Sequence, residues 1–384
     1  MVSRNMLVYV ALVLLVVALG SGVYVKTYLD RENRGTGNGV VRFTAGYDIY
    51  INGELVAHKE NDPITKHFIY AVIDNLLLLN TGKEVEWMDY EGNIHTLLDL
   101  GSVDYGTVFK YIPLIYVVLG NGTGSASVDD YTVFSEVARI KVDDMTLDEG
   151  ENEYVITYFL DWVSDKDFNL TEIALISLQY LYKSDTTTFL MIAHDNVNTI
   201  HVNVNDTVSI RYRIRLVYDP EGGLTRNFFY LVLRHFLGYA VYAKSVSGSD
   251  AALDNGHDTN SDNYDLVTDN ITLALLKVST WGNPVFTTYT YSDKYIADNY
   301  EITLSSNETS ITLGYKFTVS ETEAFTFNGI AITVYTDICD WKKGTYADQI
   351  IPDYIVLFVG KYQEIDVSSD QYVEAEISIT FNFG

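Results

Sequence analysis

A short stretch of this chain is written twice. Residues 65–72 (TKHFIYAV) recur 160 positions later as residues 225–232 (TRNFFYLV), with Thr, Phe, Tyr and Val kept and Lys replaced by Arg. Residues 168–175 (FNLTEIAL) recur at nearly the same offset as residues 325–332 (FTFNGIAI). Short motifs that repeat in the same order at a fixed spacing are typical of duplicated structural units. The sequence therefore predicts two tandem copies of one fold.

Each copy is expected to begin with a helix. In the first copy Asp62-Pro63 precedes a predicted helix at 64–80, and Thr81-Gly82 ends it. Phe68, Val72 and Leu76 lie four residues apart, so they form one apolar stripe that packs on a core. The stretch 225–243 carries the same stripe in the second copy.

Beyond each helix the apolar residues alternate with polar ones, which is typical of half-buried strands. The first copy is predicted to contain strands at 112–119, 133–142, 153–160, 168–178, 189–193 and 197–218. The second is predicted to contain strands at 273–279, 300–304, 311–319, 325–335, 354–359 and 372–383. Before the first helix, strands at 40–44 and 47–58 contain Asn52-Gly53, which favours a hairpin with a type I′ turn.

These patterns predict a mainly β protein in five parts. Residues 1–25 are a transmembrane anchor or signal segment, and 26–39 are a stalk. Residues 40–218 are a first antiparallel β-sandwich domain that includes the N-terminal hairpin. Residues 219–223 (DPEGG) are a linker, since Pro ends a strand and Gly lets the chain turn. Residues 224–384 are a second sandwich, and each sandwich has one packed helix.

The N-terminal segment from Met6 to Val25 is uncharged over 20 residues, with Arg4 before it and Lys26 after it. Twenty helical residues match a hydrocarbon core of about 30 Å. A secretory signal has a shorter apolar centre and a small-residue cleavage site, so a retained transmembrane helix is favoured over a cleaved leader. The expected location is a membrane-anchored protein with an extracellular C-terminal body, or a secreted one if the leader is cleaved.

The charge balance limits the class of partner. The chain has 52 acidic and 25 basic residues, a formal charge of −27. Such a field repels nucleic acid, so no nucleic-acid partner is expected. The closing strands of the two copies nevertheless differ: Arg211, Arg213 and Arg215 line one, and Glu374 and Glu376 line the other. Pairing between molecules or domains is one explanation, and solvated or locally paired faces are the other.

Four short motifs occur in the first copy in a fixed order. They are Leu119-Gly120-Asn121-Gly122-Thr123, Glu136-Val137-Ala138-Arg139, residues 170–175 (LTEIAL) and residues 206–214 (DTVSIRYRI). In this order the first copy resembles structural domains of tailed-phage tail-fibre and baseplate-type proteins. The second copy lacks the Leu-Gly-x-Gly-Thr motif. The resemblance implies a non-catalytic subunit of an assembled particle or appendage.

Few residues form patterns with chemical meaning. Asp258, Asn260, Asp262 and Asp269 stand at positions 1, 3, 5 and 12 of a calcium-loop pattern, with Asn263 at the usual Gly position. They are either a Ca²⁺ site, the one cofactor considered, or a solvated polar loop. An acidic cluster between 143 and 153 would suit a glycosidase, or simply a turn. Histidines are scattered and no hydrolase or nucleotide motif occurs, so an enzyme is not expected.

Five Asn-x-Ser/Thr sequons are candidate glycan sites if the body is extracellular. They are Asn121, Asn169, Asn205, Asn270 and Asn307. The favoured function is a non-enzymatic structural protein of a surface assembly, a virion or an appendage, which associates with itself or with other surface proteins. The alternative is an adhesin or receptor-binding module that recognises glycans through exposed Tyr and Trp, for which Trp87, Trp162, Trp281 and Trp341 are candidates.

Overall fold

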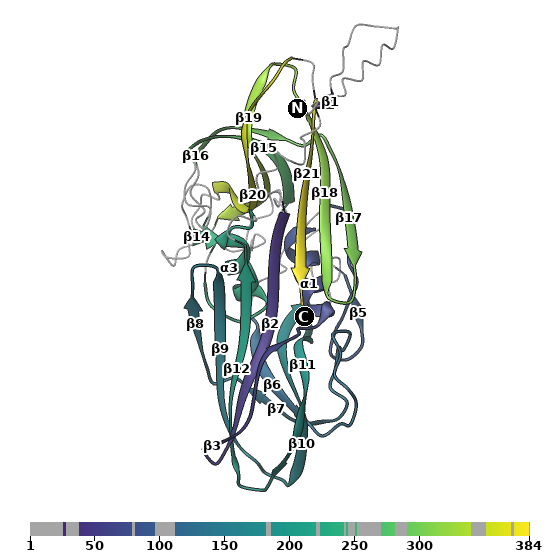
Figure 1. Cartoon of the computed structure of the whole chain (residues 1–384), viewed down its shortest axis with the longest axis vertical. Helices are drawn as coiled ribbons and strands as arrows, with labels where there is room; N and C mark the ends of the chain where they lie inside the picture. Colours follow the sequence, from purple (N-terminus) through teal and green to yellow (C-terminus); the bar gives the residue numbers. More distant parts are fainter. Residues whose placement is uncertain are drawn as a thin grey trace, which may run out of the picture.

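The computed structural model describes most of the chain after the N-terminal segment. The described residues are 26–27, 38–78, 81–96, 112–181, 186–219, 223–241, 243–244, 250–251, 270–280, 290–338, 351–369 and 372–383. Within them the protein is mainly β, with two α-helices, α1 (Lys66–Leu77) and α3 (Arg226–His235). Figure 1 shows an elongated molecule with the first copy in its lower part and the second in its upper part.

One sheet runs through both copies. It has nine strands, and its main path is β17-β18-β21-β2-β12-β9-β8, with β3 paired to β2 and β1 paired to β21. The bounds are β1 (Lys26–Thr27), β2 (Asn38–Ile51), β3 (Glu54–Asp62), β8 (Asp144–Glu149), β9 (Glu153–Val163), β12 (Thr207–Tyr218), β17 (Asn299–Ser306), β18 (Ser310–Ser320) and β21 (Tyr372–Asn382).

Each copy adds a four-stranded sheet, and the two have the same order. The first is β11-β10-β6-β7 and the second is β20-β19-β15-β16. The bounds are β6 (Leu114–Gly120), β7 (Glu136–Lys141), β10 (Phe168–Leu181), β11 (Thr186–Val202), β15 (Asn270–Thr280), β16 (Thr290–Ile296), β19 (Phe325–Ile338) and β20 (Ile351–Val367). Together with β8-β9-β12 matching β17-β18-β21, the strand order repeats as the duplicated motifs predict.

Two short pairs complete the β structure. They are β4 (Trp87–Met88) with β5 (Ile94–His95), and β13 (Ala243–Lys244) with β14 (Asp250–Ala251).

Strand β2 joins the two copies into one sheet. Along one edge, Val41 to Ile51 pair antiparallel with β12 of the first copy. Along the other edge, Asn38 to Arg42 pair in parallel with β21 of the second copy, and β3 takes over after them. Alternate residues of β2, among them Phe43 and Tyr47, are buried. The strand thus lies between the copies (Figure 1), and the main hydrophobic core contains residues of both.

The duplicated Thr fixes each helix to its own four-stranded sheet in the same way. The Thr65 amide donates to the Ile192 carbonyl at 2.9 Å, and its hydroxyl donates to Met191 O at 2.7 Å. The Thr225 amide donates to the Leu357 carbonyl at 2.9 Å, and its hydroxyl donates to Val356 O at 2.6 Å. Both Thr residues are buried N-caps with extended backbones, which explains why Thr recurs at the start of the repeat.

At its far end each helix is held by the other copy. The Tyr158 hydroxyl on β9 donates to the Leu237 carbonyl after α3, at 2.7 Å. The Tyr315 hydroxyl on β18 donates to the Leu77 carbonyl at the end of α1, at 2.5 Å. Tyr158 and Tyr315 occupy equivalent positions, as do Leu77 and Leu237, so the two bonds are related by the duplication. Because helix-terminal carbonyls have no intrahelical donor, each bond satisfies a group that burial would otherwise leave unpaired.

The N-terminal hairpin is confirmed. Asn52 and Gly53 both have positive φ, 51° and 85°, which is the backbone of a type I′ turn. The predicted strand 197–218 is instead two strands, because a turn at 203–206 with Asn205 at φ 71° separates β11 from β12.

The predicted membrane anchor requires correction. In the part of the chain that the structure describes, no helix has both the length and the apolar character needed to cross a bilayer; α1 has 12 residues and α3 has 10. The segment from Met6 to Val25 lies outside the described residues. A transmembrane helix is therefore removed from the fold class, and the membrane-anchored location that depended on it is not carried further.

Candidate functional site

A buried carboxylate organises a loop beside the first four-stranded sheet. Glu172 on β10 is fully buried. Its Oε1 accepts from the amides of Gly122 at 2.5 Å and Ser135 at 3.0 Å, and its Oε2 accepts from the Phe134 amide at 2.8 Å. A buried carboxylate is tolerated only when donors surround it, and here three backbone amides do so.

The glycines of the Leu-Gly-x-Gly-Thr motif make room for this carboxylate. A Cβ on Gly120 would lie 2.7 Å from Glu172 Oε1, and one on Gly122 would overlap the same atom. Two of the four motifs behind the tail-fibre resemblance are therefore in contact, since the Gly-x-Gly loop and the LTEIAL strand form one hydrogen-bonded unit. Arg139 of the remaining Glu-x-x-Arg motif bonds Glu136 at 2.8 Å and lies over the Phe189 ring at 4.2 Å.

His194 lies between two carboxylates. Its Nδ1 is 2.7 Å from Asp130 Oδ2, and its Nε2 is 3.2 Å from Glu172 Oε2. The imidazole side chain is fully buried. Both ring nitrogens are thus within hydrogen-bond distance of a carboxylate oxygen. The arrangement ties the loop that carries Asp130 to β10 and β11.

A second polar group lies close by, between β2, β3 and β11. Asp195 accepts from the Tyr47 hydroxyl at 2.7 Å and from Lys59 Nζ at 2.6 Å, and Lys59 also pairs with Asp62 at 2.9 Å. Burial raises the pKa of Asp62 to about 6, although Lys59 acts against this shift. Burial would lower the pKa of Lys59, but its bonds to Asp195 and Asp62 outweigh burial and raise it. Burial and the bond to Asp195 raise the pKa of Tyr47 far above its usual range.

Sequence reasoning did not single out the residues of these two groups, except for Glu172 within its motif. The detectable signal was a Glu inside the otherwise apolar strand 170–176. His194 and Asp195 lie in a strand of ordinary appearance, and their partners are distant in sequence. The geometry can hold loops and sheets together. Among the described residues no set of His, Cys, Asp and Glu is arranged to hold a metal ion.

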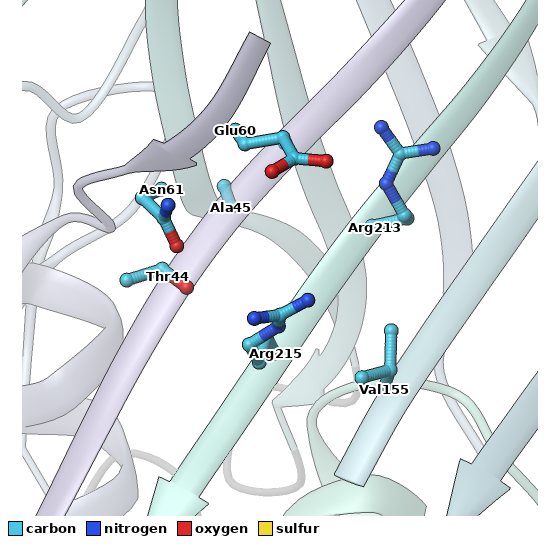
Figure 2. A pocket seen from close by; sticks show the side chains of 8 residues that line it. Thr44, Ala45, Glu60, Asn61, Val155, Arg213 and Arg215 are labelled. Atoms are coloured by element: carbon cyan, nitrogen blue, oxygen red, sulfur yellow. The ribbon is translucent and has the colours of Figure 1, made fainter. Parts of the chain in front are cut away.

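A shallow depression lies on the outer face of the long sheet. It is lined by Thr44, Ala45, Gly46, Glu60, Asn61, Val155, Arg213 and Arg215 (Figure 2). Tyr47 and the buried polar groups face the opposite side of this sheet, because neighbouring residues of a strand alternate between faces. The depression therefore does not give access to Asp62 or Asp195.

The basic face of β12 is paired within the first copy. Arg213 makes two bonds to Asp48, at 2.6 and 3.3 Å, and this pairing lowers the pKa of Asp48. Arg215 is 3.6 Å from Glu153, and Arg211 lies over the Tyr50 ring at 5.3 Å. Each Arg has a local partner, so the local explanation of this face is sufficient. On β21 Glu376 lies opposite Lys316 of β18.

The acidic cluster belongs to an edge of the long sheet. β8 (DMTLDE) is the terminal strand on the side of the first copy, and it carries three acids in six residues. Glu149 accepts from Arg226 at 2.7 Å and from Tyr230 at 3.2 Å, so part of the cluster holds α3 against the first copy. The equivalent terminal strand of the second copy, β17 (NYEITLSS), has one acid in eight residues.

The remaining predicted sites are separate from these groups. The calcium candidates Asp258, Asn260, Asp262 and Asp269 lie outside the described residues, as do Trp281 and Trp341. Asn121, Asn169, Asn205 and Asn307 are exposed, and Asn270 begins β15. Trp87 is buried and Trp162 is partly buried, so Trp87, one of the four candidates of the adhesin alternative, is not free to bind a glycan.

Comparisons with protein-family models, with curated proteins and with solved structures give no match for this chain. The resemblance to tail-fibre and baseplate-type domains therefore remains a prediction from the motifs.

Proposed function

We propose that this protein is a non-enzymatic structural subunit of a larger assembly, a virion or an appendage, which associates with itself or with other structural proteins. The single observation that carries this proposal is the exposed edge of β17. A sheet edge presents unpaired backbone donors and acceptors to another strand, and natural proteins usually protect such edges with charge, Pro or bulges. Strand β17 has no Pro and no basic residue, and one acid.

The use of polar groups in the first copy also supports a structural role. Glu172, His194 and Asp130 bond one another and the backbone of one loop. Lys59, Asp62 and Asp195 connect β3 to β11. Glu172, His194, Asp62 and Asp195 are four of the seven buried Asp, Glu and His side chains described in the first copy, and their partners are parts of the fold.

Electron microscopy of the purified full chain tests this function. Negative-stain images over a range of protein concentrations are expected to show filaments, shells or regular oligomers. Particles of monomer size at every concentration and ionic strength would contradict the proposal. Binding of the monomer to a glycan array, without assembly, would favour the adhesin alternative.

A further inference from the structure

The terminal strand β17 is exposed on both faces, although it belongs to a well-packed sheet. Of its eight residues only Ile302 is buried. Tyr300 is 45 % exposed and Leu304 is 41 % exposed, and both lie on the same face of the strand as Ile302. This face continues the apolar inner face of the long sheet, where Leu304 lies opposite Leu313.

The ladder with β18 determines which backbone groups point away from the sheet. The amide of Asn307 donates to the Ser310 carbonyl at 2.9 Å, next to the pair Ser306–Ile311. Hydrogen-bonded pairs alternate along an antiparallel ladder, so odd-numbered residues of β17 bond to β18. The N–H and C=O groups of Tyr300, Ile302 and Leu304 are therefore directed to the free edge.

We propose that β17 pairs with β17 of a second copy of this chain, antiparallel, about a two-fold axis at Ile302. The inference rests on the proposed function and names the partner at that edge. In this register Ile302 lies opposite its own symmetry mate. Tyr300, whose hydroxyl donates to the Thr81 carbonyl at 3.3 Å, lies opposite the partner's Leu304, so the exposed aromatic and aliphatic side chains of one copy cover those of the other.

Charge favours this register and this partner. Glu301 lies opposite the partner's Thr303, so the two Glu301 carboxylates do not face each other. Pairing β17 with β8 of another molecule would instead place Glu301 beside a strand with three acids. β1, a further edge strand of the long sheet, has only two residues, and β3 carries charged residues along its length and is tied to β11 by Lys59. Among the edge strands of the long sheet, β17 is thus the best match for itself.

Leu304→Pro tests the interface, with Leu147→Pro as the matched control. Leu147 is the equivalent residue of β8. It pairs with Ile156 of β9, as Leu304 pairs with Leu313 of β18, at the same position of the ladder. In β8 the Gly150 amide donates to the Glu153 carbonyl, so even-numbered residues bond to β9 and the backbone groups of odd-numbered residues face the free edge. Each Pro therefore removes an N–H that points away from the sheet. Only Leu304→Pro removes bonds of the proposed dimer.

Sedimentation of the full-length chain gives the readout. The wild type and Leu147→Pro are expected to dimerise alike, and Leu304→Pro to weaken the dimer more than about tenfold. A wild type that stays monomeric at its highest soluble concentration would overturn the inference, as would equal effects of the two Pro variants. Larger assemblies that persist in Leu304→Pro would overturn the inference but leave the proposed function standing. If the wild type forms neither dimers nor larger assemblies, both the inference and the proposed function are contradicted.

Charge variants at Thr303 test the register. Thr303→Lys places a cation opposite the partner's Glu301 and is expected to tighten the dimer several-fold, and Thr303→Glu to weaken it by a similar factor. Thr146, the equivalent exposed residue of β8, gives the control variants Thr146→Lys and Thr146→Glu, which are expected to leave the dimer unchanged. If neither Thr303 variant changes the affinity of the dimer, or if Thr303→Glu tightens it and Thr303→Lys weakens it, the two-fold axis at Ile302 is refuted.

Discussion

The two copies share one strand order but place their charges differently. The first copy keeps ionisable groups inside, with Glu172 and His194 bonded to each other and to a loop. At the equivalent positions the second copy has Gly329 and Val359, which pair with Leu276 and Ala331. The edges of the long sheet differ as well: the first copy ends in the acidic strand β8, and the second ends in the nearly uncharged strand β17.

The difference shows that the fold itself does not need the buried polar groups. The second copy builds the same sheets with apolar side chains there, among them Leu276 and Val359. In the first copy Glu172 instead holds the loop at 121–135, which bonds through Gly122, Phe134 and Ser135. The duplication thus gives one copy with a fixed loop and a protected edge, and another with an open edge.

The largest effect is expected from Glu172→Leu. This change keeps the volume of the side chain but leaves three backbone amides without their acceptor and His194 without one of its two carboxylate partners. The free energy of unfolding should fall by about 3–5 kcal/mol, as when one partner of a buried pair is removed. Urea denaturation measures it, with Glu172→Gln as the control that keeps one acceptor oxygen and loses less. If Glu172→Leu were as stable as the wild type, the first copy, like the second, would not need a carboxylate at this position.

Lys294 of the second copy should show the next largest effect. Burial lowers the pKa of Lys294 to about 7, whereas Lys in an unfolded chain has a pKa near 10.4. Between these values the unfolded chain binds more protons, so the stability of the wild type should rise as pH increases from about 7 to 10.

Lys294→Met should remove this slope and add about 2–3 kcal/mol of stability near pH 7. Denaturation curves at several pH values across this window measure both effects. A wild type with flat stability across the window would show that the amine is not held neutral by burial.

Asp62 offers the matching experiment in the first copy, with the opposite sign. Burial raises the pKa of Asp62 to about 6, above the value near 3.9 of an unfolded chain. The native state therefore binds more protons between these values, and its stability should fall as pH rises from about 4 to 6. Asp62→Asn should remove this fall and raise stability at pH 7 by about 1–2 kcal/mol, net of the lost pairing with Lys59. If the stability of Asp62→Asn fell equally between pH 4 and 6, the fall would belong to another titratable group.

The smallest effects concern the symmetric contacts between the copies. Tyr158→Phe and Tyr315→Phe each remove a hydroxyl that donates to a helix-terminal carbonyl of the other copy. Each should cost about 1–2 kcal/mol, and the two costs should be similar. Thermal denaturation compares them directly. If Tyr158→Phe lowered the stability and Tyr315→Phe did not, the two copies would not stabilise each other equally.

Local patterns predicted most elements of the fold. The apolar stripe of the repeated stretch located both helices, and Asn52-Gly53 located the hairpin, because each depends on neighbours in sequence. The position of β2 between the copies was not predictable in this way. Its register with β21 joins Asn38 to Ser378, and alternation alone does not say which strand a given strand will pair with.

The candidate sites show the same limit. The composition of β17 was readable, but its place at the edge of a sheet follows from pairings along the whole chain. Glu172 was visible as a charge in an apolar strand, whereas its partners at 122 and 134–135 come from distant segments. The local partners of Arg211, Arg213 and Arg215 likewise depend on strand order, which the alternation of residues leaves open.

Hydrogen exchange at the two sheet edges tests the central claim most directly. The amides of Ile302 and Leu304 in β17 and of Leu147 and Glu149 in β8 all point away from the sheet, so dilute protein should exchange all four quickly. As the concentration of the full chain rises, the two amides in β17 should become protected while those in β8 remain fast. Equal exchange at both edges, or exchange in β17 that does not depend on concentration, would contradict assembly through the open edge.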